Sequence, residues 1–296
     1  MRSTKERRPL RLWLAAGGPL VLAVLLAAVT ACDQIILPEE PEEPVYDNPV
    51  DPDSPDFVAP QTTITDGPAE GSTISTNSAT FTWQGNLSGM LFQARLNGSD
   101  WSPWSTAVGV TLEYLDEIAY TFEVRSAYNP GVGNTPTLID DSPASRSFTV
   151  DAVTGPALRL SPTLTLLEQD DTFDIDLIAE DVSDLMMVAT IIRFNPNRHQ
   201  VISAPTEGSF LTSTGGSIAK YIVYDNSAGT IEVNMATATG SPPGVSGTGT
   251  VLTIQFQQIN SENGAIWFAT GSSVMRDSNN NAITLTGTHG AVTIIR

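Results

Sequence analysis

Phe173-Asp174-Ile175-Asp176-Leu177-Ile178 alternates apolar and polar side chains, which is the two-residue period of a β-strand with one buried face. Further on, Met187-Val188-Ala189-Thr190-Ile191-Ile192-Arg193-Phe194 is apolar at nearly every position, as expected of a strand that needs cover on both faces. Short runs of this kind, separated by Gly, Pro, Asn and Ser, begin near Thr62 and continue along the chain without a long helical period. The sequence therefore predicts an all-β protein.

The strand runs fall into two groups, which predicts two folded domains. The first is expected over residues 60–151, a fair size for one small sandwich, with strands at 79–83, 91–96 and 120–125. The second is expected over residues 156–296, where longer runs predict a two-sheet sandwich or jelly roll. Besides the two stretches quoted above, its strands are expected at 158–160, 219–223, 230–236, 248–257, 265–268, 283–285 and 291–295.

Features of the first domain are typical of immunoglobulin-like sandwiches. Asn97-Gly98 is a hairpin signal because both residues tolerate positive φ, and Tyr120 follows Leu115 at the spacing of a tyrosine corner. Three runs resemble bacterial Ig-like and fibronectin type III-like modules, and the resemblance covers most of residues 60–150. They are Leu96-Asn97-Gly98-Ser99-Asp100-Trp101-Ser102, Tyr120-Thr121-Phe122-Glu123-Val124-Arg125 and Ser145-Arg146-Ser147-Phe148-Thr149-Val150. The resemblance implies that this domain is a spacer.

Three tryptophans of the first domain need separate interpretations. Trp83 lies in an alternating strand and is expected in the core. Trp101 and Trp104 could form a platform on which sugar rings stack, because aromatic faces suit the apolar faces of pyranose rings. The same two residues could instead pack along the edge of a hairpin, and the sequence leaves both interpretations open.

The single cysteine, Cys32, closes an apolar run as Val29-Thr30-Ala31-Cys32, after a basic start and the apolar stretch 12–31. This is the layout of a secretory signal. It resembles the lipobox of bacterial lipoproteins, which implies removal of residues 1–31 and lipidation of Cys32. An uncleaved membrane-spanning helix is the alternative, but Gly17, Gly18 and Pro19 weaken a helix there and no basic stop-transfer cluster follows Cys32.

The chain is strongly acidic, with 14 Lys and Arg against 33 Asp and Glu and a net charge of −19. Removal of residues 1–31 would leave nine basic and 32 acidic residues, a net charge of −23. Such a surface repels phosphate backbones, which argues against a nucleic-acid partner. With no cysteine beyond Cys32, the domains have no intrachain disulfide. Residues 32–59 are acidic and proline-rich, which predicts an extended tether.

A family resemblance covers nearly all of residues 157–296. The segments that carry it, in order, are Gln169-Asp170-Asp171-Thr172-Phe173, Val182-Ser183-Asp184-Leu185, Arg193-Phe194-Asn195-Pro196-Asn197, Gly208-Ser209-Phe210-Leu211, the run 244–256 and Arg276-Asp277-Ser278-Asn279-Asn280-Asn281. Together they resemble a cohesin domain. The resemblance implies a jelly-roll β-sandwich, similar in fold to some carbohydrate-binding modules, that binds dockerin modules on one sheet face to assemble polysaccharide-degrading enzymes.

In the family, the partner-binding face includes the strand that here spans residues 187–194. Alternation places Val188, Thr190, Ile192 and Phe194 inward, and it places Met187, Ala189, Ile191 and Arg193 outward. The outward four are therefore the candidate partner-binding residues. Met187 and Ala189 depart from the polar side chains that cohesins often carry there. Either this apolar stripe meets a partner, or a loop of the same domain covers it.

The sequence carries no motif for catalysis or for a metal. His199 and His289 are the only histidines, and there is no Gly-x-Ser-x-Gly, His-Glu-x-x-His, P-loop or dinucleotide fingerprint. Acidic residues could supply a carboxylate pair for glycoside hydrolysis, but known glycosidase folds generally need more chain than two small sandwiches leave. Asp277-Ser278-Asn279-Asn280-Asn281 starts like a calcium loop but has Ala282 and Thr288 in place of the required glycine and glutamate, so we expect a polar hairpin turn.

These observations predict an exported lipoprotein of the bacterial cell envelope, facing the periplasm or the exterior. An acidic tether and an Ig/FnIII-like spacer would present a cohesin-like module that captures dockerin-bearing partners for polysaccharide breakdown. We expect no enzyme activity and no cofactor. The main alternative is direct carbohydrate binding, by the same sandwich or by Trp101 and Trp104. A purely structural envelope protein is a third interpretation.

Overall fold

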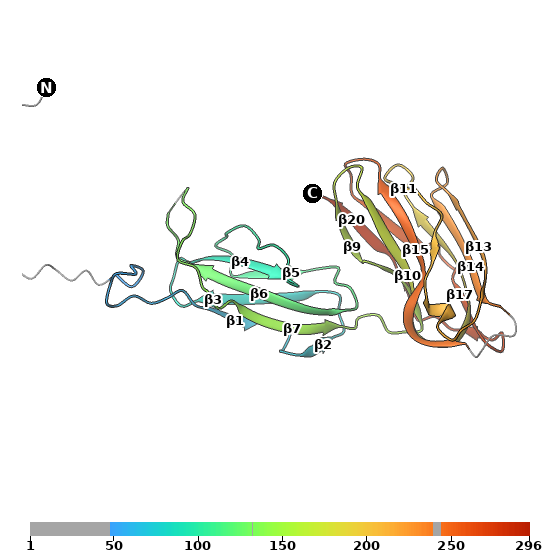
Figure 1. The fold of residues 1–296 in the computed structure, drawn as a ribbon, viewed down its shortest axis with the longest axis horizontal. Coiled ribbons are helices and arrows are strands. Elements are labelled where there is room, and N and C mark those ends of the chain that lie inside the picture. The colour runs from blue at the N-terminus through green and yellow to red at the C-terminus, as the bar shows by residue number, and fades with distance from the viewer. Residues whose placement is uncertain (1–47, 132, 239–243) are drawn as a thin grey trace, which may run out of the picture. The chain divides into compact units, whose positions relative to one another are not determined.

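The computed structural model describes residues 48–131, 133–238 and 244–296 (Figure 1). Nearly all of their regular structure is β-strand, with one 3-10 turn, η1 (Phe210–Thr212), which confirms the all-β prediction. The chain divides into two units, Met1–Phe57 and Val58–Arg296. The predicted signal segment, Cys32 and most of the predicted tether lie outside the described residues. In the first unit, the described residues form turns, in which the Ser54 N–H donates to the Asp51 carbonyl (2.9 Å).

The first seven strands of the second unit form two sheets (Figure 1). One contains β1 (Thr62–Asp66), β3 (Ala79–Gly85) and β5 (Gly109–Leu112), in that order. The other contains β2 (Ser72–Ile74), β7 (Ala144–Val150), β6 (Ala119–Ala127) and β4 (Leu91–Leu96). All pairings are antiparallel except that of β2 with β7. The inner faces of the two sheets enclose one core, so this part of the chain is a sandwich, as predicted.

Aromatic rings fill this core. Phe81 on β3 stacks on Phe122 on β6 with ring centroids 4.0 Å apart, and Trp83 and Phe148 tilt against these rings. Trp83 is 6% exposed, which confirms its predicted place in the core. Burying a side chain of this size contributes roughly 1.5–3 kcal/mol. Because Phe81 faces Phe122, the pairing of aromatic residues holds the two sheets together.

Two local predictions in the first sandwich are confirmed. The hydroxyl of Tyr120 accepts a hydrogen bond from the Asp116 N–H (2.7 Å), which is the tyrosine corner. Asn97 and Gly98 have φ of 50° and 69°, as a tight hairpin turn requires. The chain after this turn returns along β4, where Ser105 and Phe92 exchange backbone hydrogen bonds of 2.7 and 3.0 Å.

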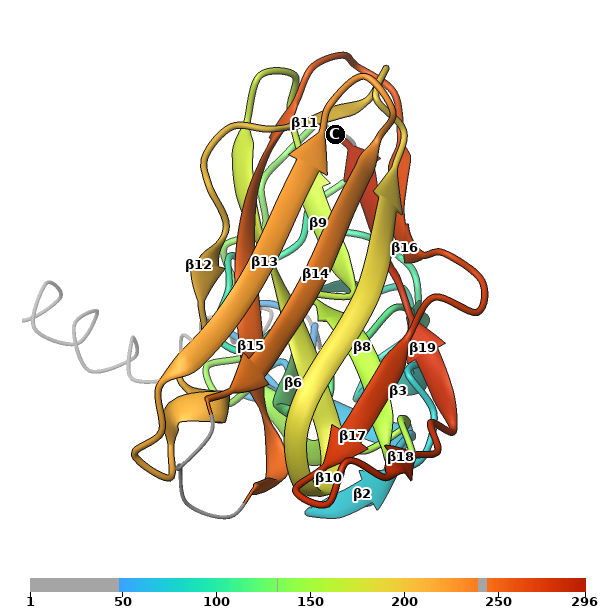
Figure 2. The same cartoon turned by 90° about the vertical axis from the view of Figure 1, so that its right-hand side faces the viewer.

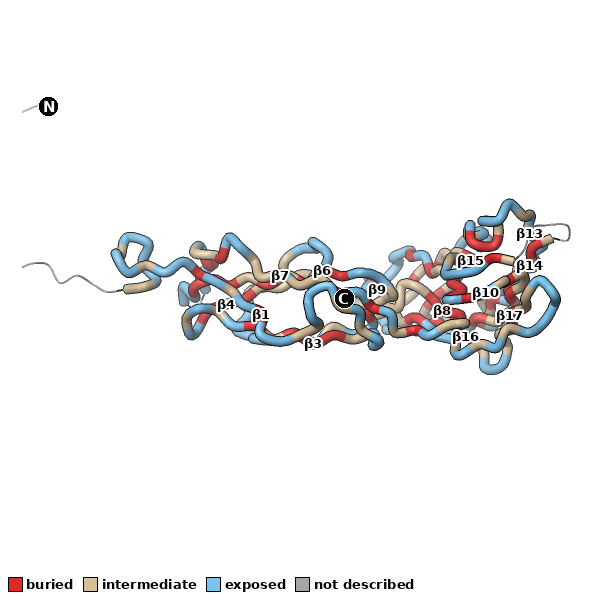
Figure 3. Tube along the Cα trace, turned by 90° about the horizontal axis from the view of Figure 1, so that it is seen from below, coloured by how far each residue is buried: buried red, intermediate tan, exposed pale blue. Residues whose placement is uncertain are grey.

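The strands from β8 onward form one hydrogen-bonded sheet of thirteen strands that folds back on itself around a second core. Its strands are β8 (Ala157–Ser161), β9 (Leu164–Leu167), β10 (Thr172–Phe194), β11 (His199–Val201), β12 (Thr206–Glu207), β13 (Ile218–Asp225), β14 (Thr230–Thr237), β15 (Val245–Gln258), β16 (Gly264–Phe268), β17 (Val274–Asp277), β18 (Ala282–Ile283), β19 (Gly287–His289) and β20 (Ala291–Ile295). Among the described residues, no strand of this group pairs with β1–β7. Along β3, β14 and most of β10, buried positions alternate with less buried ones (Figure 3).

The long strand β10 belongs to both layers of this sandwich. Its first half pairs with β8 and β15, and its second half pairs with β14, β16 and β17. Between the halves, Asp181 and Asp184 have positive φ, and the register with β15 shifts at both places. Their N–H groups donate to Thr248 Oγ1 and Ser246 Oγ, each at 3.0 Å, so the bulges leave neither group unpaired. The two strands predicted at 173–178 and 187–194 are therefore parts of one bent strand.

His199 on β11 is a fully buried titratable group in this core. Its Nε2 lies 2.9 Å from Thr293 Oγ1, and its ring meets Phe173 and Phe256 edge-on. Burial is the largest cause that lowers the pKa of His199, from 6.5 to about 4. The folded protein therefore holds this imidazole neutral at a pH where the unfolded chain protonates it.

We predict that the free energy of unfolding falls as the pH drops from 6.5 towards about 4, because the unfolded state then binds one more proton than the folded state. The share due to His199 is at most roughly 3–4 kcal/mol, since one pKa unit corresponds to about 1.4 kcal/mol. Denaturant unfolding across this pH range, on wild type and on His199→Gln, measures it. The variant keeps a polar group beside Thr293 but does not titrate, so its curve should be flatter. Parallel curves would contradict the prediction.

Candidate functional site

One layer of the second sandwich presents an open sheet surface formed by β13, β14, the second half of β10 and β17, which lie side by side (Figure 2). Along β10, Val188, Thr190, Ile192 and Phe194 are buried, whereas Met187, Ala189 and Ile191 are half-buried and Arg193 is exposed. The predicted inward and outward positions are therefore confirmed. That the outward residues bind a partner stays a prediction.

The strand register brings further side chains onto this surface. Met187 lies opposite Arg276 on β17, and Ala189 lies opposite Val274 on the same strand. Arg193 lies opposite Trp267 on β16. On the other side, β14 separates β10 from β13, whose Tyr221 pairs with Asn234 and whose Val223 pairs with Glu232. Residues far apart in the sequence thus form one continuous outer surface.

Large apolar side chains on this surface are exposed to solvent. The exposed fractions are 57% for Tyr221, 46% for Val223, 42% for Trp267 and 37% for Val274. We call these four, together with Met187, Ala189 and Ile191, the apolar face. On β14, Glu232 and Asn234 lie between the β13 members and the β10 members. Exposed apolar side chains gathered on one surface mark interaction sites in soluble proteins.

A shallow hollow of about 290 Å³ interrupts the apolar face. Met187 and Tyr221 stand on either side of it, and the small side chains of Ala219 and Ala236 form its floor. Ala236 pairs with both Met187 and Ala219, so two alanines sit side by side where larger residues would fill the surface. The hollow can therefore receive one apolar side chain of a partner.

Charged residues border the apolar face at its ends. None of the described residues gives Arg193 a hydrogen bond or an ion pair, and its side chain is exposed. Arg276 donates one hydrogen bond to the Asn280 carbonyl (2.8 Å). Glu232 accepts a hydrogen bond from Asn234 (3.1 Å), and both lie on β14 between the β13 members and the β10 members of the face. The apolar face thus has an arginine at each end and a polar strip within it, a mixture of apolar and polar groups that interfaces share.

The turn after β17 is the polar hairpin that the sequence suggested. The Asp277 carboxylate accepts hydrogen bonds from the N–H groups of Asn279 and Asn281 and from the Asn281 side chain, at 2.7–3.0 Å. The side-chain bond from Asn281 is the largest cause that lowers the pKa of Asp277. Asn280 takes the left-handed conformation, with φ of 64°. Within the described ranges, no group of three or more His, Cys, Asp or Glu side chains could hold a metal ion.

The predicted sugar-stacking residues lie on the first sandwich. The guanidinium groups of Arg95 and Arg125 each lie 4.3 Å from the ring centroid of Trp101, and Arg125 lies 5.8 Å from that of Trp104. Arg95 in turn pairs with Glu123 through two hydrogen bonds of 2.7 and 2.9 Å. Trp101 therefore packs against a row of charged side chains. Glycan stacking by Trp101 and Trp104 stays a prediction.

The other predicted site residue, Cys32, lies outside the described residues. In the part of the chain that the structure describes, no helix has the length and hydropathy needed to cross a bilayer. Sequence reasoning missed Tyr221, Val223, Val274 and Trp267. Alternation within each strand gave a weak signal for them, but only the pairing of β13, β14, β10, β16 and β17 shows that they share one surface.

No protein-family model matches this chain, and no curated protein matches it. Solved structures are similar to part of it. A type II cohesin domain from the cellulosome of Acetivibrio cellulolyticus is 15% identical, with a TM-score of 0.41 over 46% of this chain and 94% of that chain. A non-cellulosomal cohesin from Archaeoglobus fulgidus is 16% identical, with a TM-score of 0.38 over 47% and 90%. The third cohesin of ScaC from Acetivibrio cellulolyticus, in complex with the ScaB dockerin, is 13% identical, with a TM-score of 0.39 over 47% and 99%.

The neighbouring residues Ile191 and Ile192 test the orientation of the face. Ile192 is 0% exposed, so Ile192→Ala should lower the free energy of unfolding by roughly 2–5 kcal/mol. Ile191 points outward and is half-buried, so Ile191→Ala should cost about 1 kcal/mol or less. Denaturant unfolding of both variants measures the difference. Equal costs would mean that Ile191 is covered in solution.

Proposed function

We propose that this chain is a lipid-anchored binding protein outside the cytoplasm, and that the apolar face of its second sandwich captures a dockerin-type protein module. The anchor rests on the lipobox-like sequence that ends at Cys32. The observation that carries the binding role is the apolar face itself, seven outward residues of one sheet surface, of which the four large side chains of Tyr221, Val223, Trp267 and Val274 are exposed.

The composition of the apolar face favours a protein over a glycan. Five of its members are aliphatic side chains or Met, and its two aromatic residues, Tyr221 and Trp267, stand on opposite sides of β14 and β10. With strands about 4.8 Å apart, three strand spacings separate the two residues by roughly 14 Å across the sheet, and they are also offset along the strands, since Tyr221 is level with Ala189 and Trp267 with Arg193. A line of adjacent rings, which would suit a sugar chain, is not formed by the described residues of this face.

The sequence resemblance supports the same surface. The ordered segments between residues 169 and 281 resemble a cohesin, whose partner-binding face includes the strand equivalent to the second half of β10. In this chain that half-strand lies at the centre of the apolar face, with β14 on one side and β17 on the other. A dockerin helix laid across these strands would bury Met187, Ala189 and Ile191 and place one side chain in the hollow beside Tyr221.

The remaining parts of the chain have supporting roles in this proposal. The acidic, proline-rich residues 32–59 would hold the folded part away from the membrane, and the first sandwich would extend that reach. The captured partner would be an enzyme or structural protein of polysaccharide breakdown, kept at the cell surface. Trp101 and Trp104 are the basis of the second candidate, direct binding of glycans.

We predict that the full-length protein captures dockerin-bearing proteins from the extracellular proteome of its native organism, and that EDTA abolishes capture because dockerins hold calcium. Met187→Asp/Ile191→Asp should weaken binding about ten-fold or more, since it places two carboxylates at the centre of an apolar interface. Mass spectrometry identifies the captured proteins, and titration of one purified partner measures the affinity.

The matched control is Thr63→Asp/Thr149→Asp, which adds the same two charges at exposed strand positions of the first sandwich. It should bind as the wild type does. A panel of insoluble polysaccharides is tested beside the proteome. Retention on a polysaccharide, without a protein partner, would replace the dockerin proposal with glycan binding, and Trp101→Ala/Trp104→Ala would then show whether that pair is responsible.

A further inference from the structure

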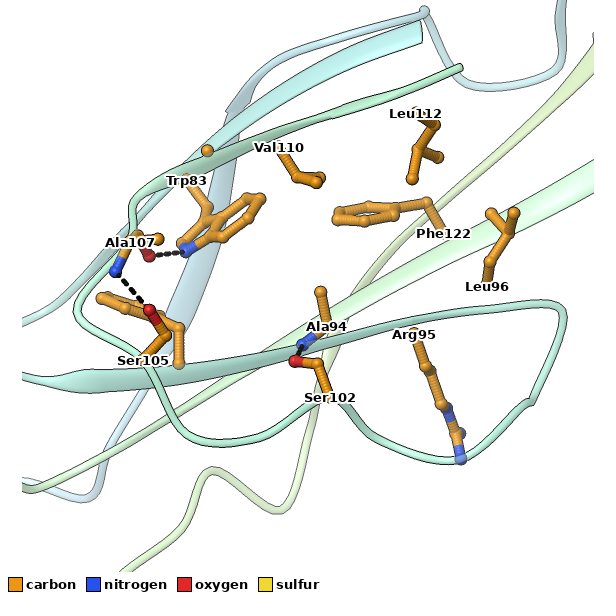
Figure 4. A pocket seen from close by; sticks show the side chains of 12 residues that line it. Trp83, Ala94, Arg95, Leu96, Ser102, Ser105, Ala107, Val110, Leu112 and Phe122 are labelled. Carbon is orange, nitrogen blue, oxygen red and sulfur yellow. Dashed lines mark hydrogen bonds between the residues drawn. The ribbon is translucent and has the colours of Figure 1, made fainter. Parts of the chain in front are cut away.

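The first sandwich contains an apolar cavity that the proposed function does not use. It measures about 300 Å³ and opens between β5 and β4 (Figure 4). Val110 and Leu112 of β5 line one side, Ala94 and Leu96 of β4 line the other, and the rings of Trp83 and Phe122 lie at its inner end. The small side chain of Ala94 takes an inward position between Phe92 and Leu96 and leaves this space in the core.

The polar groups around the cavity already have partners. Trp83 Nε1 donates to the Ala107 carbonyl (3.2 Å), and Ser102 Oγ accepts from the Ala94 N–H (3.0 Å). Ser105 Oγ accepts from the Ala107 N–H (3.1 Å), and Arg95 is paired with Glu123. The cavity therefore offers almost only apolar contact. Cavities of this kind do not hold ordered water well and bind apolar groups. Their volume, at the lower end for ligand sites, suits one or two side chains.

A free strand edge lies at the mouth of the cavity. The two sheets end in β5 and β4, but residues 102–105 pair with the outer edge of β4, whereas in the described part of the chain β5 pairs only with β3. The Trp83 N–H donates to the Val108 carbonyl, and Phe81 pairs with Val110. Because bonded and non-bonded pairs alternate in an antiparallel ladder, the N–H and C=O groups of Gly109 and Thr111 point to the open side. An extended peptide can pair with them.

The charges near one end of the cavity indicate what such a peptide carries. Leu96 and Leu112 mark this end, and the chain that follows them bears the exposed carboxylates of Asp100 and Glu113. No described residue gives either carboxylate a hydrogen bond or an ion pair. The positive charge of Arg95 is compensated by Glu123, and the whole chain has a net charge of −19. The surroundings of the cavity therefore favour basic residues next to the apolar ones.

We propose that this cavity is a second binding site, for an extended peptide that adds as a strand to the free edge of β5. One or two large apolar side chains at alternate positions enter between the sheets and contact Trp83, Val110 and Phe122. Lysine or arginine residues beyond them face Asp100 and Glu113. The site is independent of the apolar face of the second sandwich. The peptide and a dockerin would therefore bind at different places on this protein.

The probe is a displayed library of random twelve-residue peptides, selected on the full-length protein and counter-selected on Ala94→Phe, whose ring fills the cavity. We expect enriched peptides with alternating large apolar residues and a basic flank. A synthetic copy of the most enriched peptide should bind Ala94→Phe at least about ten-fold more weakly than wild type. Binding should protect the amides of Gly109 and Thr111 from hydrogen exchange.

Thr111→Pro tests the strand edge without filling the cavity, because it removes the outward N–H and leaves the bonds of Val110 to β3. It should also weaken binding about ten-fold or more. Thr80→Val is the matched control, since it loses the same hydroxyl contact between Thr80 and Thr111 (3.0 Å) but keeps the edge N–H. Denaturant unfolding checks that each variant is folded. If Ala94→Phe does not fold, the comparison of peptide binding by Thr111→Pro and wild type tests the proposal by itself.

Either of two results would overturn the proposal. In one, no peptide is enriched on the wild type over the counter-selection variant. In the other, enriched peptides bind Thr111→Pro as tightly as wild type, which would place them elsewhere on the molecule. Met187→Asp/Ile191→Asp separates the two sites, because it should weaken dockerin capture and leave peptide binding unchanged. Failure of one site therefore says nothing about the other.

Discussion

The crossing of β10 from one layer of the second sandwich to the other is the constraint on which the candidate binding surface depends. Asp181 and Asp184 form bulges with positive φ, and their N–H groups are satisfied by Thr248 and Ser246. Beside the bulges, Glu180 pairs with the buried Arg159 and also accepts a hydrogen bond from Thr248 (2.7 Å). A buried pair of this kind is costly to break on one side, so the bend is held firmly. Once the bend is fixed, alternation along the second half of β10 decides which residues face outward.

Local sequence signals predicted the features that depend on one strand or one turn. The alternation at residues 173–178 and 187–194, the turn at Asn97 and Gly98, and the hydroxyl contact of Tyr120 all follow from side chains near one another in the chain. The joining of residues 173–194 into one strand was not predicted, because aspartate in the left-handed conformation reads as a break in the pattern. Pairing between strands determined the other features, the apolar face and the cavity.

The apolar face and the cavity show why pairing between strands could not be read from the sequence. Tyr221 and Ile191 lie on strands that β14 separates. They face the same side of the sheet only because Tyr221 pairs with Asn234 and Ile191 pairs with Glu232. The cavity depends on Ala94 lying across from Val110, in strands of different sheets. Each is a property of two or more segments at once. The two proposed sites therefore use different physical means, an exposed sheet surface in one sandwich and a gap between sheet edges in the other.

The outer edge of β13 has a further consequence for how copies of the protein behave beside one another. Within the described ranges β13 pairs only with β14, and its eight residues contain no proline or bulge while Tyr221 and Val223 are exposed. Open strands of this kind tend to join with their like and begin aggregation. A net charge of −19 makes neighbouring molecules repel before such edges can meet. The acidity of the chain therefore contributes to colloidal stability. High ionic strength screens this repulsion, so aggregation is expected to be greatest at high protein concentration in high salt.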